Sequence, residues 1–88
     1  MSLRVEDEDQ GLRALQGLVG SLRQEADAAQ APSKEAWLFN RAVEDESGAA
    51  ELAREKNYMR AAERFILAAF LFEKAKEVAL ESAGAGRE

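Results

Sequence analysis

Apolar residues recur every three or four positions along most of the chain, which is the periodicity of helices that bury one face. The pattern is clearest in residues 9–30, where the apolar positions follow a strict 3-4-3-4-3 spacing: Leu12, Leu15, Val19, Leu22, Ala26 and Ala29. This spacing predicts one continuous helix. Gly17 and Gly20 weaken the helix locally, but the apolar seam passes through them without a change of phase.

A second periodic stretch covers residues 34–56 and follows a break at Ala31-Pro32-Ser33, where Ser33 is expected to cap the new helix. Its predicted inner face carries small and large apolar residues: Leu38, Ala42, Ala49 and Leu52, flanked by Phe39, Val43, Ala50 and Ala53. Asp45 interrupts this face. In one interpretation the helix rotates until Asp45 reaches solvent or pairs with Arg41, and in the other Asp45 is buried and needs a donor.

A third helix is predicted over residues 58–82, after a tight turn in which Asn57 suits a cap or a left-handed position. It contains the run FILAAFLF, residues 65–72, and over these two turns the helix has no polar side. At about 100° per residue, the helix sorts into three apolar stripes. The first holds Tyr58, Ala61, Ala62, Phe65, Ala69, Phe72 and Ala79; the second holds Met59, Ile66 and Phe70; the third holds Leu67, Leu71 and Val78.

Three helices with short connections predict an all-α fold, an antiparallel three-helix up-down-up bundle that forms a single domain over residues 1–88. Residues 1–8 and 83–88 are expected to fray. Because a helix in such a bundle touches two neighbours, one stripe of the third helix is surplus. We expect Met59, Ile66 and Phe70 to meet a partner chain, most simply a second copy in a homodimer, since methionine is common at binding surfaces. Alternatively, helix curvature or the N-terminal arm covers them.

The composition excludes several kinds of chemistry. The 88 residues include no Cys and no His, which removes thiolate catalysis, Cys-based zinc sites and the commonest general base. The acidic run before Gly11 fails the calcium-loop register, because Gly17 stands where a bidentate Glu is required. Glu44-Asp45-Glu46 lacks the His of carboxylate-bridged metal sites, although a magnesium site made only of carboxylates stays open. We therefore expect no enzyme activity and no cofactor.

Charge and hydropathy bear on the partners and the compartment. A net charge of −5 argues against binding nucleic acid through a broad basic face. The chain has no signal-peptide pattern and no apolar run longer than eight residues, so we expect a cytoplasmic protein without a membrane span. Four cations cluster near the second inter-helix turn: Arg54, Lys56, Arg60 and Arg64. They form a candidate patch for an acidic partner, or they pair locally with Glu51, Glu55 and Glu63.

The stretch NYMRAAERFILAA resembles the second half of a tetratricopeptide-repeat hairpin, a pattern that MIT-type domains share. Tyr58, Ala61, Phe65 and Ala68 match its Tyr-x-x-Ala-x-x-x-aromatic-x-x-Ala spacing. The match covers about 25 residues and no second repeat follows, so the stacked peptide-binding groove of repeat arrays is not implied. The resemblance implies a helical hairpin and a non-enzymatic protein–protein interaction module.

A weaker resemblance is to HEPN-type helical domains, through WLFNRAVEDESGAAELAREKNY and the later FEKA. Active members of that family cleave RNA with an Arg and a His, and this chain has no His. The resemblance therefore implies the helical bundle without the nuclease chemistry. It leads to an alternative function: a catalytically inert, HEPN-like component of a nucleic-acid-linked system of the toxin–antitoxin type.

Overall fold

The computed structural model describes the backbone of residues 2–85 and the side chains of residues 10–81. Four helices follow one another along the chain: α1 (Ser2–Ala28), α2 (Ala31–Lys34), α3 (Ala36–Arg54) and α4 (Tyr58–Ala85). The described backbone contains no strand, which confirms the all-α prediction. The number of helices differs from the prediction, because the predicted break between the first two helices contains the short helix α2.

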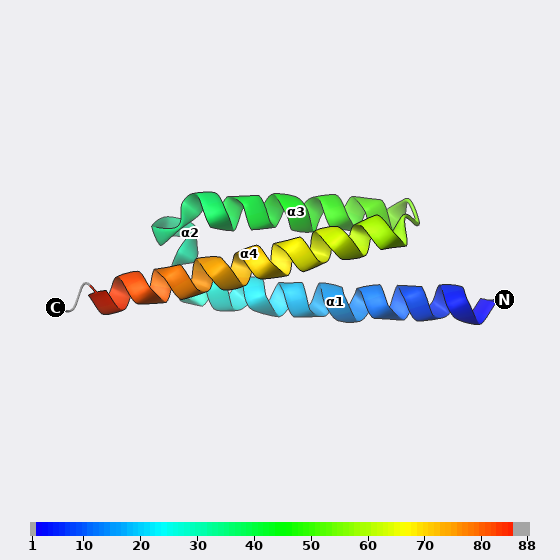
Figure 1. Ribbon diagram of the computed structural model, residues 1–88, viewed down its shortest axis with the longest axis horizontal. Coiled ribbons are helices and arrows are strands. Elements are labelled where there is room, and N and C mark those ends of the chain that lie inside the picture. The colour runs from blue at the N-terminus through cyan, green and yellow to red at the C-terminus, as the bar shows by residue number, and fades with distance from the viewer. Residues whose placement is uncertain (1, 86–88) are drawn as a thin grey trace.

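The long helices lie side by side in a rod about 59 Å long and 18 × 14 Å across. Figure 1 shows α4 lying between α1 and α3, with α3 running in the opposite direction to the other two. α4 packs extensively on both neighbours, whereas α1 and α3 barely touch each other. One side of α4 therefore faces the two other long helices, and its opposite side faces away from them.

The first helix begins earlier than predicted, at Ser2 instead of residue 9, and ends at Ala28 instead of residue 30. No Pro or Gly stands among residues 1–8, so nothing in this stretch prevents an earlier start. The helix is continuous through Gly17 and Gly20, as predicted. At the other end of the chain, α4 extends to Ala85, three residues beyond the predicted end at 82. The structure has residues 2–8 and 83–85 in helix, residues 1 and 86–88 lie outside the described backbone, and the fraying of the chain ends stays a prediction.

The connection after α1 differs from the prediction. Gln30 adopts a left-handed conformation (φ 67°), and its carbonyl accepts hydrogen bonds from the backbone of Ser33 and Lys34, which starts α2. Pro32 lies in the first turn of this short helix, where a backbone N–H would have no partner within the helix, so the missing N–H of proline costs nothing. Ser33 does not cap the next helix, because its hydroxyl donates to the Gln30 carbonyl at 3.1 Å. α3 consequently begins at Ala36, not at residue 34, and ends at Arg54, not at residue 56.

The turn between α3 and α4 is a Schellman motif. Lys56 adopts a left-handed conformation (φ 64°) and donates to the carbonyl of Ala53, while Asn57 donates to that of Leu52. The residue in the left-handed position is thus Lys56, next to the Asn57 that the sequence suggested. The Asn57 carbonyl accepts the first helical hydrogen bond of α4, from Ala61.

The core is narrow and built largely of alanine. Its buried positions are Leu12, Val19, Ala26, Ala31, Ala42, Ala49, Ala61, Phe65, Ala68, Phe72, Ala75 and Ala79. Small side chains let the helix backbones approach closely, and Phe39 and Phe72 fill the space between α3 and α4 with an edge-to-face contact, ring centroids 5.3 Å apart. Within the described part of the chain, no helix has the length and apolar character needed to cross a membrane.

A candidate interaction site on α4

The buried side of α4 follows a single seam. Ala61, Phe65, Ala68, Phe72, Ala75 and Ala79 are spaced 4-3-4-3-4 and are all buried. This seam agrees with the first predicted stripe and adds Ala68 and Ala75 to it. Because only one seam is covered by α1 and α3, residues half a turn away lie on the open side of the helix.

Large apolar side chains occupy that open side. Met59, Ile66 and Phe70 have exposed fractions of 78%, 58% and 64%. The structure thus brings the three residues of the predicted second stripe together on one exposed face. We call Met59, Ile66 and Phe70 the α4 apolar face. Whether a partner covers this face stays a prediction.

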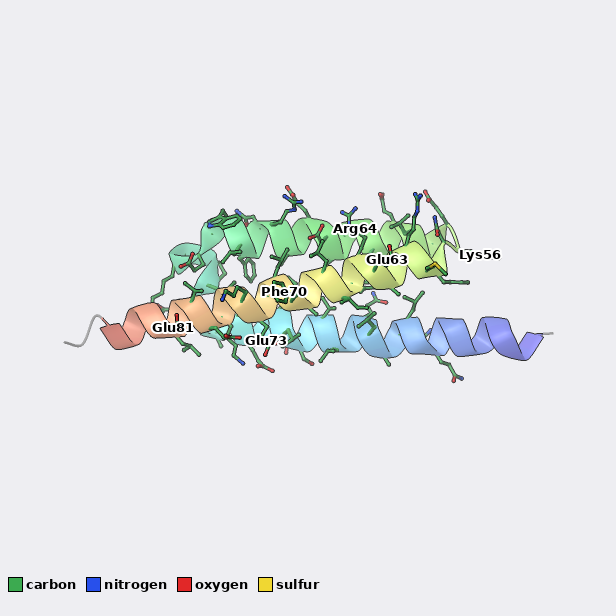
Figure 2. All side chains as sticks on the ribbon, viewed as in Figure 1. Lys56, Glu63, Arg64, Phe70, Glu73 and Glu81 are labelled. Atoms are coloured by element: carbon green, nitrogen blue, oxygen red, sulfur yellow. The ribbon has the colours of Figure 1, made fainter. Side chains whose placement is uncertain are left out.

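Acidic residues border the α4 apolar face. Glu63, Glu73, Glu77 and Glu81 are all exposed on α4, and Lys74 is the exposed cation among them. Figure 2 shows Glu63, Phe70, Glu73 and Glu81 in succession along the helix. Phe70, Glu73, Lys74 and Glu77 line a shallow depression on the surface of the helix. The edge of the apolar face is therefore predominantly negative.

Two hollows lie between α1 and α4, and we call the path along these two helices from one hollow to the other the groove. The hollow near the start of α4 measures about 270 Å³ and is lined by Gly11, Leu12, Leu15, Tyr58, Met59 and Ala62. Further along the same pair of helices, a hollow of about 310 Å³ is lined by Glu25, Ala28, Ala29, Lys76 and Leu80. Met59 is therefore shared by the groove and the apolar face.

An ion pair closes the second hollow against α1. Lys76 Nζ donates to Glu25 Oε1 at 2.7 Å, joining the two helices. This hydrogen bond and the charge of Glu25 raise the pKa of the Lys76 ammonium, with smaller contributions from the nearby Glu73 and Glu77. The ammonium is thus held in its charged form at the end of the groove.

Sequence reasoning missed two further exposed apolar residues. Leu18 of α1 and Leu80 of α4 are each 52% exposed. Leu18 lies off the buried seam of α1, yet it stands three residues after Leu15 and four before Leu22. That 3-4 spacing, which puts all three leucines on one side of α1, was the available signal. Leu80 lies seven residues, or about two helical turns, after the exposed Glu73. This spacing puts both on the same side of α4 and was the available signal for its exposure.

Asp45 is buried at the centre of the α3–α4 contact. Its residue is 3% exposed, and its carboxylate oxygen Oδ1 lies 3.2 Å from Arg64 Nη2. Arg41, one turn earlier, lies 4.0 Å from Oδ2, which has no hydrogen-bond partner. The structure agrees with the second interpretation, because Asp45 is buried and does not reach solvent. Arg64 is its ion-pair partner from α4, and Arg41 is the predicted neighbouring charge.

Gly48 makes room for this ion pair. A Cβ atom at position 48 would lie 2.7 Å from Arg64 Nη2, closer than two such atoms approach in real structures. Packing therefore explains the glycine in the middle of α3: the guanidinium of Arg64 lies against the backbone of Gly48, where a side chain would collide with it.

The four cations of the predicted acidic-partner patch remain on the surface. Arg54, Lys56, Arg60 and Arg64 are all exposed near the turn between α3 and α4. Arg64 pairs with Asp45 and not with the predicted Glu63. A docking role of the patch stays a prediction, and its Arg64 is already engaged in the fold.

The acidic motifs do not assemble into a metal centre in the described part of the chain. Among these residues, no group of three carboxylates is placed to hold a metal ion. Glu44 faces solvent, Asp45 is buried, and Glu46 pairs with Arg23 of α1 at 2.7 Å. These three adjacent acids therefore lie in three different environments. The acidic run of residues 6–9 has its side chains outside the described range.

Comparison with family models, with curated proteins and with solved structures returns no match to the chain. The resemblance to tetratricopeptide-repeat, MIT-type and HEPN-type domains therefore remains an inference from residue spacing.

Proposed function

We propose that this chain is a non-enzymatic, helical protein–protein interaction module that binds a helical partner through the α4 apolar face. In this proposal, the three long helices act as one antiparallel up-down-up bundle that presents α4. The observation that supports it is the exposure of Met59, Ile66 and Phe70 on one side of one helix. Large apolar side chains exposed on one face are typical of interaction sites.

The energetic argument follows from the small core. The largest fully buried side chains are Phe65, Phe72 and Val19, and most other buried residues are alanine. Covering an exposed Ile, Met or Phe contributes about 1.5–3 kcal/mol each. A small domain has a total stability of only about 5–15 kcal/mol, so covering three such residues changes its free energy substantially.

Two kinds of occupant fit this face. The sequence led us to expect a second copy of the chain, which would give a homodimer. A helix from another protein would cover the same residues. Both occupants depend on Phe70, which lies at the centre of the open side of α4 with 64% of its surface exposed.

The test is sedimentation velocity over micromolar to millimolar concentration, on the chain alone and mixed with a synthetic helical peptide that carries a leucine stripe. We expect association in at least one of the two settings and its loss in Phe70→Glu. Circular dichroism should show that Phe70→Glu stays helical, because an exposed position tolerates the charge. Trp37→Glu is the matched control, since Trp37 is 71% exposed but lies on α3, away from this face. Association that is absent in both settings, or unaffected by Phe70→Glu, would overturn the proposal.

A further inference from the structure

Resting on the function proposed above, we propose that the occupant is a basic amphipathic helix of another protein, lying along the groove between α1 and α4. The charges around the α4 apolar face favour this occupant over a second copy of the chain. The groove offers apolar contacts to the partner helix, and the glutamates of α4 attract its cations.

The groove offers apolar contacts from both helices. On the α1 side, Leu15, Leu18 and Leu22 share one side of the helix, and Leu15 lines the first hollow. On the α4 side, Ala62 lines the same hollow, and Ile66 follows it by one turn. Phe70, one turn further on, lies farther round α4 and lines the separate depression beside Glu73. A helix laid here would therefore contact two helices, as each helix of a four-helix bundle does.

The length of the groove sets the length of the partner helix. The two hollows span α4 from Met59 to Leu80. At a rise of about 1.5 Å per residue, a helix of about 20 residues would cover this length. An apolar stripe with a 3-4 spacing would keep its contacts in the groove over the whole distance.

Glutamates interrupt the open side of α4 at regular places. Its central line of residues has a 4-3-4-3-4 spacing and reads Met59, Glu63, Ile66, Phe70, Glu73, Glu77. Three of its six positions are thus acidic and exposed. Any helix packed along this line brings its own residues opposite these carboxylates.

A second copy would bring carboxylates opposite carboxylates. In a parallel two-fold pair of α4 helices, each residue of the line meets its own copy, so Glu63, Glu73 and Glu77 each face an identical glutamate. In an antiparallel pair that joins Ile66 to Phe70, Glu63 faces Glu73 of the second copy. Like charges placed directly across an interface are unfavourable, and the net charge of −5 adds to the repulsion.

A partner helix with Lys or Arg beside its apolar stripe reverses the sign of these contacts. The acidic positions Glu73, Glu77 and Glu81 lie in the second half of α4, so the cations of the partner are needed mainly at that end. Lys76 is directed toward Glu25 at 2.7 Å, and Lys74 is the exposed cation of α4 beside Glu73 and Glu77, so the glutamates outnumber the cation on this part of the open side.

The experiment uses the full chain and two synthetic helical peptides of equal length with the same leucine stripe. One peptide carries Lys beside the stripe and the other carries Glu. Binding is measured by fluorescence anisotropy at low and at moderate salt. We expect the Lys peptide to bind about tenfold more tightly than the Glu peptide, the combined effect of three exposed ion pairs, and the difference to shrink as salt screens them.

Two variants separate groove binding from general attraction between a basic peptide and an acidic protein. The Glu73→Lys/Glu77→Lys variant should abolish or reverse the preference for the Lys peptide. Phe70→Glu makes the protein more acidic, so general attraction predicts binding at least as tight as to the unmodified chain. The groove model predicts at least a tenfold loss, which Met59→Glu should reproduce and Trp37→Glu should not.

Equal binding of both peptides, or a preference that survives Glu73→Lys/Glu77→Lys, would overturn the basic-partner inference. So would a homodimer in sedimentation that Phe70→Glu dissolves, although that result would support the proposed interaction function. If neither peptide binds and the chain is monomeric at every concentration, both the inference and the proposed function fail.

Discussion

Replacing Arg64 by alanine should destabilise the fold more than replacing its partner Asp45. Arg64 Nη2 on α4 lies 3.2 Å from the buried carboxylate oxygen Oδ1 of Asp45 on α3, and Arg41 lies farther from this carboxylate, at 4.0 Å. Removing Arg64 leaves a charge that is 3% exposed without its nearest cation. Removing Asp45 instead leaves an arginine whose side chain is 44% exposed and can turn to water.

The expected size follows from these exposures. Breaking a fully buried ion pair by removing one partner costs about 3–5 kcal/mol. Because Arg64 is partly exposed, solvent screens the pair, and we reduce the expected loss for Arg64→Ala to about 2 kcal/mol. Asp45→Ala loses the same contact but also removes the desolvated carboxylate and places a better helix former in α3, so we expect a change of less than about 0.5 kcal/mol.

Urea denaturation followed by circular dichroism measures both free energies of unfolding. At the slopes typical of small domains, 2 kcal/mol lowers the midpoint by about 1–2 M. The double variant Asp45→Ala/Arg64→Ala should be as stable as Asp45→Ala, because no buried charge is left unpaired. If Arg64→Ala lies within about 0.5 kcal/mol of the unmodified chain, or if Asp45→Ala is the more damaging change, the reasoning about the buried carboxylate is refuted.

Three further predictions concern other local features. Gly48→Ala should stabilise the unmodified chain by less than about 0.5 kcal/mol, because the new Cβ displaces Arg64. In the Arg64→Ala background the same change should stabilise by about 1 kcal/mol. Equal effects in the two backgrounds, measured by urea denaturation, would contradict the packing role of Gly48. Lys56→Gly should stabilise by about 1 kcal/mol because Lys56 is left-handed, and thermal melting showing no gain would count against this. The raised pKa of Lys76 means that its pair with Glu25 contributes fully below the ordinary value of 10.5 and is lost as pH rises through the higher folded-state value. Urea midpoints between pH 8 and 12 should therefore fall more steeply in the unmodified chain than in Lys76→Met, and parallel curves would refute the linkage.

Much of the fold could be predicted from the sequence because apolar spacing decides which side of a helix is buried. The predicted seam from Leu12 to Ala29 and the predicted inner face of α3 are both part of the core. Spacing also predicted that one stripe of α4 lies open, since a helix with two neighbours cannot bury three stripes, whereas the choice of Met59, Ile66 and Phe70 rested on the methionine.

The remaining features depend on contacts between residues far apart in the chain. The state of Asp45 was undecided because its donor, Arg64, comes from another helix, and helical spacing shows only the neighbour Arg41. The short helix α2 was missed because it depends on a left-handed Gln30, a residue type without a strong preference for that conformation. The exposure of Leu18 was missed because the sequence does not show which side of α1 lies against α4.

The most direct test of the central claim is a map of backbone amide shifts by nuclear magnetic resonance, as the Lys peptide is titrated into the labelled chain. Binding along the open side of α4 predicts shifts that cluster at Met59, Ile66, Phe70 and, across the groove, Leu18. Shifts centred on the cationic patch around Arg54 and Arg60, or no shifts at saturating peptide, would contradict it.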